Sequence, residues 1–174
     1  LSSILAMDEV PMKAGLKSKG KMKQTYFWPI YGEEDEIAFT WSTNRGAQHA
    51  KAQLTGFNGV LLSDGYQAYT SVISALNKDD EANIIHATCW AHTRRYFDKA
   101  LLMEPELSKQ ALTQIAKLYE IEKHIRENLT YGDEILAYRQ KYSEPIVDTF
   151  FNWLYEQRQR PEILPSNPFS KALS

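Results

Sequence analysis

Two short apolar runs, each bounded by glycine or polar residues, constrain the fold of this chain more than any other feature. The first run, residues 59–62, is continuous and ends in Ser63-Asp64-Gly65, whereas the second, residues 82–90, is apolar apart from Asn83, His86 and Thr88. Continuous apolar runs of this length are typical of strands that are buried on both faces. Between the runs, apolar residues recur at helical spacing from 66 to 76. The sequence therefore predicts an α/β core in which strands and helices alternate.

The rest of the chain divides into a strand-rich beginning and a helical end. Three early segments are predicted strands: 4–14 around Asp8, 23–31, which is rich in aromatic and β-branched residues, and 36–42, which alternates. Pro29 lies in the second of these, so we expect it at an edge or a bulge. Helical spacing predicts the helices that follow: 47–54, 93–103, about 107–129, a segment from about 133, and a segment beginning at Ser143. The proline-rich stretch 160–168 predicts extended chain.

Composition excludes several classes of protein. The chain has 174 residues, of which 43% are hydrophobic and 24% charged, which indicates a globular protein. One cysteine cannot form an intramolecular disulfide, and no apolar run approaches the roughly 18 residues of a membrane span. We therefore expect a cytosolic protein.

The charge of the chain gives no overall argument for nucleic-acid binding, because its formal net value is −2. Locally, five lysines and no acid lie between Val10 and Gly32, and Lys19 and Lys21 occupy the middle of that stretch. A solvated hairpin explains them, and so does a loop that contacts phosphates.

The predicted element order up to residue 103 resembles that of a ribonuclease H-like domain, a mixed sheet of five strands flanked by helices. The resemblance implies that the first and fourth strands are adjacent and parallel, with Asp8 on one and Asp64 at the end of the other. Carboxylates placed so closely repel each other unless a cation lies between them. Hard oxygen ligands suit Mg²⁺ or Mn²⁺.

Three ordered motifs, at residues 7–11, 56–69 and 89–97, resemble the transposase of the insertion sequence 66 family. The resemblance implies a DNA transposase that acts on transposon ends and target DNA, works as a homo-oligomer when complete, and holds two metal ions with an Asp-Asp-Glu triad. Asp8 and Asp64 would be its first two acids. It also implies a ribonuclease H-like core over 1–104, a helical insertion over 105–160, and a tail over 161–174 leading to the remainder of the core.

The third acid of the triad is the main departure from the family pattern. By the resemblance it follows the segment similar to residues 164–172, and no such motif occurs before residue 174. We expect this chain to be inactive by itself. Two rival functions stay open: a metal-dependent nuclease that uses Glu120 or Glu122, and a non-catalytic module for DNA binding or oligomerisation.

Further candidate contacts to DNA follow the second apolar run. Arg94 and Arg95 are expected to open a helix, where basic residues are unfavourable, which favours phosphate contact over a solvated turn. Cys89 and His92 resemble a Cys-x-x-His signature of several transposase families, although a buried cysteine beside a hydrogen-bonded histidine explains them equally well. Two such residues make only half of a zinc site. Tyr66, directly after Asp64-Gly65, could stack on a base or simply pack.

Overall fold

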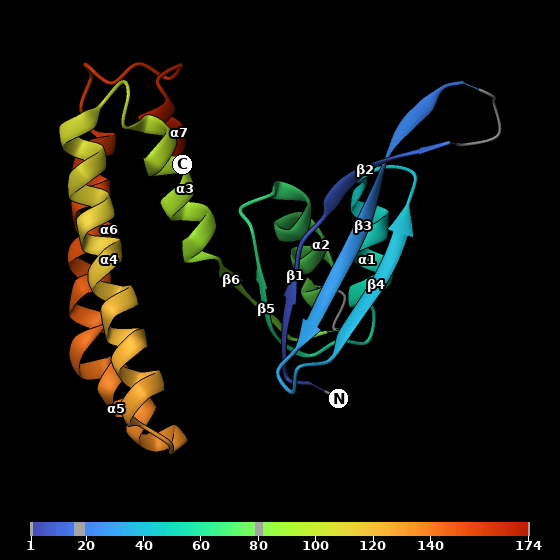
Figure 1. Ribbon diagram of the computed structural model, residues 1–174, viewed down its shortest axis with the longest axis horizontal. Coiled ribbons are helices and arrows are strands. Elements are labelled where there is room, and N and C mark those ends of the chain that lie inside the picture. Colours follow the sequence, from blue (N-terminus) through green and yellow to red (C-terminus); the bar gives the residue numbers. More distant parts are fainter. Residues whose placement is uncertain (1, 16–19, 79–81, 174) are drawn as a thin grey trace. The chain divides into compact units, whose positions relative to one another are not determined.

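The computed structural model describes residues 2–15, 20–78 and 82–173. The chain divides into two compact units, here called the sheet unit (residues 1–89) and the helical unit (residues 90–174). Figure 1 shows strands in the first unit and helices alone in the second. In this division the helix after the last strand lies in the helical unit.

The sheet unit contains a mixed sheet, which confirms the predicted fold class. Its strands within the described residues are β1 (Ile4–Met7), β2 (Val10–Gly15), β3 (Met22–Gly32), β4 (Ile37–Ser42), β5 (Gly59–Ser63) and β6 (Ile84–Thr88). β1 pairs antiparallel with β3 and parallel with β5, and β5 pairs parallel with β6. The expected adjacency of the first and fourth predicted strands is therefore confirmed.

The first predicted strand is divided in two in the structure. β1 and β2 nevertheless pair with β3 in one continuous register, because Met7 lies opposite Ile30 and Val10 lies opposite Phe27. The interruption falls opposite Pro29, which accepts a 3.4 Å hydrogen bond from the Asp8 amide but has no N–H to return. Since β3 also pairs with β4, Pro29 lies in an inner strand, and the expectation of an edge or bulge is wrong.

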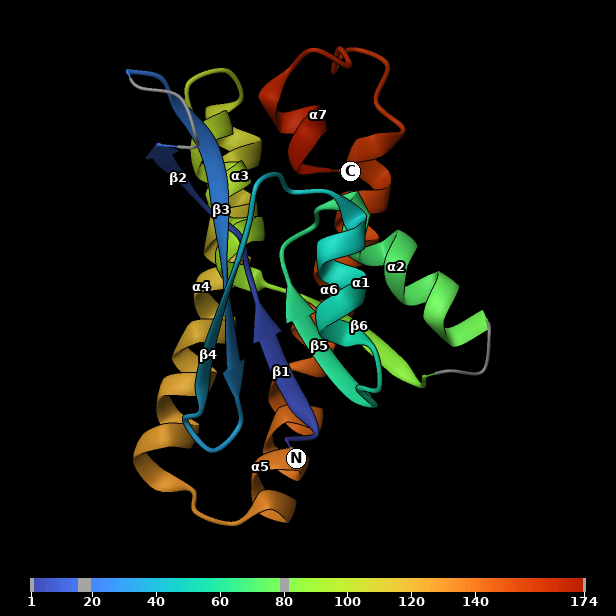
Figure 2. The ribbon, with the colours of Figure 1, turned by 90° about the vertical axis from the view of Figure 1, so that its right-hand side faces the viewer.

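Two helices, α1 (Ala47–Leu54) and α2 (Gln67–Lys78), cover one face of this sheet. Figure 2 shows the two helices together on the same side of the strands. Their apolar stripes bury a single core with the inward residues of the sheet: Met7, Trp28, Ala50, Leu54, Leu61, Tyr69, Val72, Ile73, Leu76 and Ile84. On the opposite face the large side chains of Val10, Phe27 and Phe39 are exposed. This asymmetry gives the sheet a core face and an open face.

The helical unit contains α3 (Trp90–Ala100), α4 (Pro105–Asn128), α5 (Gly132–Tyr142), α6 (Glu144–Arg158) and α7 (Pro168–Ala172). Phe97, Ile115, Phe150 and Phe169 are buried in its core. Aromatic rings make up much of this core, with the centroids of Phe97 and Phe150 6.0 Å apart. Within the described residues, no helix is both long and apolar enough to cross a membrane.

The end of the chain departs from the sequence prediction. We expected extended chain over residues 160–168, yet Pro168 begins α7. Asn167 explains the difference, since its side chain accepts a 2.9 Å hydrogen bond from the Phe169 amide and so caps the new helix. Proline is tolerated in that first turn because its missing N–H needs no partner there.

Candidate active site

The candidate site lies at the carboxyl ends of β1 and β5, where the sequence placed Asp8 and Asp64. In this parallel pair Ile4 lies opposite Val60 and Ala6 opposite Leu62, so partners differ by 56 positions. Asp8 and Asp64 also differ by 56 positions (64 − 8), and each lies two residues beyond the last pair. Extending the register therefore places them opposite each other, on strands about 4.8 Å apart.

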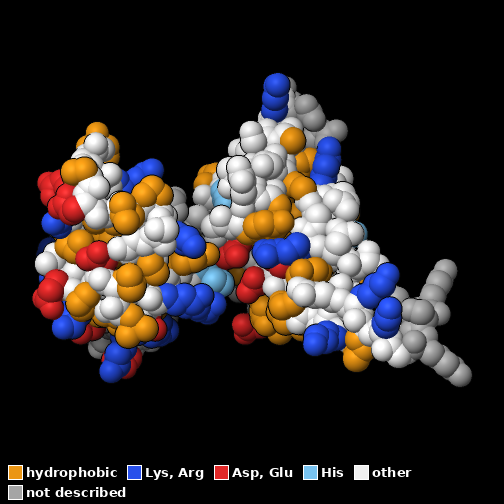
Figure 3. All heavy atoms as spheres, turned by 90° about the horizontal axis from the view of Figure 1, so that it is seen from above, with side chains coloured by type: hydrophobic (Ala, Val, Ile, Leu, Met, Phe, Trp, Pro, Cys, Tyr) orange, Lys and Arg blue, Asp and Glu red, His pale blue; other side chains and the backbone are white. Residues whose placement is uncertain are grey.

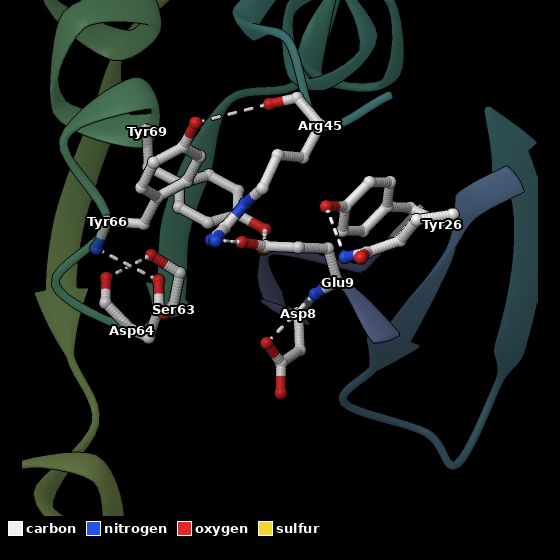
Figure 4. Close-up of polar contacts among 9 residues, drawn as sticks. Asp8, Glu9, Tyr26, Arg45, Ser63, Asp64, Tyr66 and Tyr69 are labelled. Carbon is white, nitrogen blue, oxygen red and sulfur yellow. Dashed lines mark hydrogen bonds and ion pairs between the residues drawn. The ribbon is translucent and has the colours of Figure 1, made fainter. Parts of the chain in front are cut away.

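Backbone amides orient both carboxylates. Oδ1 of Asp8 accepts a 2.8 Å hydrogen bond from the Glu9 amide, and Oδ1 of Asp64 accepts a 2.9 Å bond from the Tyr66 amide. Figure 4 shows the Asp8 carboxylate pointing away from the Arg45 guanidinium, and Asp64 in the turn after β5 beside Ser63 and Tyr66. Such turns fix a short side chain against its own backbone, which lowers the entropy lost when it binds a ligand.

Glu9 points the other way and is almost fully buried on the core face. Successive residues of a strand alternate between the two faces, so Glu9 lies on the opposite face from Asp8. One oxygen of Glu9 pairs with Arg45 and the other accepts a 2.8 Å hydrogen bond from the Tyr69 hydroxyl. Burial raises the pKa of Glu9, against the opposing effects of Tyr69 and Arg45. The pKa of Tyr69 is also raised, by burial and by its bond to Glu9.

Arg45 joins this buried pair to the turn that carries Asp64. Its guanidinium carbon lies 3.9 Å from the centroid of the Tyr66 ring, and the Tyr66 hydroxyl donates a 3.3 Å hydrogen bond to the Arg45 carbonyl. The Arg45 side chain is 42% exposed, whereas that of Glu9 is 3% exposed. The cluster of Glu9, Arg45, Tyr66 and Tyr69, here called the clamp, thus links the end of β1, the start of α1 and the turn after β5.

A second contact supports the end of β5 from β6. The Ser63 hydroxyl lies 2.8 Å from Nε2 of His86 and donates a 3.0 Å hydrogen bond to the Asp64 carbonyl. Burial lowers the pKa of His86, and the negative charge of Asp64 acts in the opposite direction. The residues on both sides of the Asp64 backbone are therefore held by side chains from neighbouring elements.

The donors at this edge suit a hard cation. Two carboxylates from adjacent strand ends supply the oxygen atoms that Mg²⁺ and Mn²⁺ prefer. In the described ranges, however, no group of three or more His, Cys, Asp or Glu side chains is arranged to hold a metal. Both oxygens of Glu122 bind Arg139 instead, at 2.8 and 2.7 Å. Glu122 is therefore already paired within the helical unit.

The predicted nucleic-acid contacts of the sheet unit lie at different distances from Asp8 and Asp64. Tyr66 lies at the site, beside Asp64 and under Arg45. Lys21 is exposed just before β3, eight residues from Pro29, which accepts the hydrogen bond of the Asp8 amide. At about 3.3 Å per residue, Lys21 is roughly 26 Å along the strand from that level. Lys19 lies outside the described residues.

The remaining predicted contacts belong to the helical unit. His92, Arg94 and Arg95 lie in the first half of α3, which begins three residues earlier than the sequence indicated. Arg94 and Arg95 line one pocket of this unit, and His92 is half-buried. The amide of Cys89, directly after β6, donates a 2.9 Å hydrogen bond to the Ser63 carbonyl.

Sequence reasoning missed three residues of the clamp: Glu9, Arg45 and Tyr69. Each lies inside or beside a segment whose pattern was already noted, but their function depends on contacts across 36 and 60 positions. One signal was available for Glu9. An acid directly after a strand residue such as Asp8 must face the other side of the sheet, and a buried acid needs a partner.

Comparisons with known proteins show the family of this chain. A family model described as "Transposase IS66 family" matches residues 1–174. Three similar proteins come from Sinorhizobium fredii (strain NBRC 101917 / NGR234), where they are named uncharacterized proteins y4qI, y4jD and y4hP. They are 28%, 35% and 31% identical to this chain over 155, 91 and 130 residues, which is 83%, 52% and 67% of the chain.

Those matches cover 28%, 18% and 23% of the three relatives, so the chain spans less than a third of the length of each. The family model, by contrast, matches the chain from its first residue to its last. The chain belongs to the IS66 family of transposases.

Proposed function

We propose that this chain supplies the catalytic core of a DNA transposase, in which Asp8 and Asp64 hold divalent metal ions for phosphoryl transfer. The observation that supports the proposal is the β1–β5 register, which pairs residues 56 positions apart, the same separation as that between Asp8 and Asp64. Ligands in open α/β sheets bind at the carboxyl ends of strands, and Asp8 and Asp64 lie at the carboxyl ends of β1 and β5.

Two Mg²⁺ or Mn²⁺ ions, when bound, would polarise a DNA phosphate and stabilise the attacking and leaving oxygens. The chain's own residues prepare the site. Asp8 and Asp64 provide the ligand oxygens, and the Glu9 and Tyr66 amides hold their side chains in place. The clamp would hold the two strand ends at a constant separation. Such positioning matters because a misplacement of about 1 Å costs much of the reaction rate.

The DNA itself would be bound by groups around and beyond these acids. We propose that Tyr66 contacts the strand at the site and that Arg94, Arg95 and His92 contact DNA from α3. Lys21 would reach DNA only well away from the metal ions. Homo-oligomerisation and recognition of transposon ends are proposals for the whole protein, because the relatives are several times longer than the segment they share with this chain.

The test is Mn²⁺-dependent nicking and strand joining by the whole protein on DNA carrying its element ends. Asp8→Asn and Asp64→Asn should each lower both activities roughly a hundredfold or more, because metal-ion catalysis supplies several kcal/mol. Asp133→Asn, an exposed acid in the first turn of α5, is the matched control and should change neither. Full activity in either site variant would refute the proposal.

A second function is favoured by one observation, the absence of a third metal-ligating side chain near the pair in the described residues. A non-catalytic module would bind DNA without metal. It predicts that Mn²⁺ leaves the melting temperature unchanged, whereas the transposase core predicts a rise that Asp8→Asn removes. The nuclease alternative through Glu122 requires that its pair with Arg139 break first.

A further inference from the structure

A shallow pocket on the helical unit is lined by arginine and tyrosine side chains and lies outside the proposed metal site. Ala91, Arg94 and Arg95 of α3 line it together with Tyr119 of α4, and its volume is about 430 Å³. Ligand pockets in proteins usually hold roughly 300–1,000 Å³. The pocket is therefore large enough for a small ligand or one unit of a polymer.

The two guanidinium groups of this pocket differ from three cations of the same unit that are already paired, as Lys117 and Arg158 also do. Lys109, Lys123 and Arg139 each pair with a glutamate, at 3.4, 3.8 and 2.7 Å. Within the part of the chain that the structure describes, neither Arg94 nor Arg95 makes a salt bridge, even though Asp98 lies one turn further along α3. Their charge is thus available to an anion, and guanidinium groups bind phosphate in a bidentate manner.

Tyr119 adds an aromatic surface beside these charges. Its side chain is 42% exposed on α4, and no aromatic ring among the described residues contacts it. Ala91, which also lines the pocket, has only a methyl side chain and therefore leaves space for a ligand. An exposed ring beside two arginines is the combination that binds a base through stacking and its phosphate through charge.

Overall charge does not explain binding to this surface. Figure 3 shows acidic, basic and apolar side chains mixed over the face of the helical unit that is in view, and the whole chain carries a net charge of −2. A DNA contact here must therefore depend on a local arrangement. In duplex DNA both faces of a base are stacked on neighbours, so Tyr119 can stack only on a base that has left the duplex.

We propose that this pocket binds one unpaired nucleotide of DNA, with its phosphate on Arg94 and Arg95 and its base on Tyr119. This inference rests on the proposed function, because it takes DNA as the substrate. It goes further in stating that the bound DNA is single-stranded and that Tyr119 contacts its base. It requires no metal ion. Binding can therefore be measured in EDTA, where the chemistry assigned to Asp8 and Asp64 is silent.

The experiment is fluorescence anisotropy of the chain with a labelled 12-nucleotide oligo-dT and with a 12-base-pair duplex, both in EDTA over a series of salt concentrations. The wild type should bind the single strand more tightly than the duplex. Arg94→Ala and Arg95→Ala should weaken binding and lower the salt slope by about 0.7 for each phosphate that is no longer neutralised. Tyr119→Ala should weaken single-strand binding roughly five- to a hundredfold, and Tyr119→Phe should not.

Two control variants remove the same kinds of side chain from the helical unit outside the pocket. Lys123→Ala removes a cation of α4 that already has a partner, and Tyr155→Ala removes an exposed tyrosine of α6. Both should bind like the wild type. Because every residue changed is on the surface, the melting temperatures should stay close together, and Arg95→Lys should restore part of the affinity if charge is what matters.

The inference fails if the wild type prefers duplex or does not bind, if Tyr119→Ala binds the single strand normally, or if Lys123→Ala weakens binding as much as Arg94→Ala. Displacement of the oligonucleotide by an equal concentration of an acidic peptide would also overturn it, since the pocket would then be a general anion site. Pocket-dependent binding without Asp8-dependent nicking would instead contradict the proposed function alone.

Discussion

Asp8 and Glu9 are neighbours in the chain but face opposite sides of the sheet. Asp8 lies at the end of β1 with its carboxylate held by the Glu9 amide, whereas the Glu9 side chain is buried beneath α2 against Tyr69. Two consecutive acids therefore have different roles. We propose that Asp8 binds a ligand, whereas Glu9 fastens the strand end that carries Asp8 to α2.

The first prediction concerns the clamp. Arg45→Ala leaves the buried Glu9 carboxylate without its cation, so we expect the free energy of unfolding to fall by about 2–3 kcal/mol. Arg139→Ala removes an exposed arginine from an equally direct pair with Glu122 and should cost about 0–1 kcal/mol. Urea unfolding measures both. Equal losses would show that the clamp is an ordinary surface pair.

A second prediction concerns the start of β5. Gly59 has a φ of +139°, and a Cβ built there would lie 2.0 Å from the Ser3 carbonyl oxygen. Gly59→Ala should therefore lower the free energy of unfolding by about 2–4 kcal/mol, since the backbone must shift. Gly65→Ala meets no atom within 4 Å and should change stability by about 1 kcal/mol or less. Similar melting temperatures for the two variants would contradict this geometry.

Much of the fold could be predicted from the sequence because its signals are local. The runs that became β5 and β6 are short and apolar, and the stripe of Ile115 and Leu118 identifies α4 by spacing alone. The break between β1 and β2 was not predictable in this way. It depends on Pro29 lying opposite Asp8, which is a fact of strand pairing and not of local composition.

The site was predictable only in part for the same reason. Asp8 and Asp64 each follow an apolar strand, so each could be recognised as a candidate site residue from its neighbours in the sequence. Arg45 could not, since nothing near it in the chain shows that it reaches Glu9 across 36 positions. Tyr119 gave no signal either, because its neighbours in the pocket come from another helix.

A third prediction concerns pH. The hydrogen bonds from Arg139 hold the pKa of Glu122 below its ordinary value near 4.5 in the folded protein. A carboxyl whose folded pKa is lowered adds stability above its unfolded pKa and loses that contribution as the pH falls through the folded pKa. Stability measured from pH 6 down to pH 3 should therefore decline less steeply for Glu122→Gln than for the wild type.

The matched control for this pH series is Glu120→Gln, because Glu120 makes no salt bridge within the described ranges. Its pH profile should follow that of the wild type. The difference for Glu122 will be small, since the pair is exposed and screened by solvent. If Glu120→Gln flattens the profile as much as Glu122→Gln does, the Arg139 pair is not its cause.

The central claim, that Asp8 and Asp64 meet to hold a divalent cation, can be tested by loading the chain with Fe²⁺ and adding ascorbate and peroxide. Radicals formed at a bound iron cut the nearest backbone, so cuts should appear near residue 8 and near residue 64 together. Asp8→Asn and Asp64→Asn should each abolish both cuts, and Asp133→Asn neither. Cuts at one of the two positions alone, or cuts that persist in Asp8→Asn, would contradict the claim.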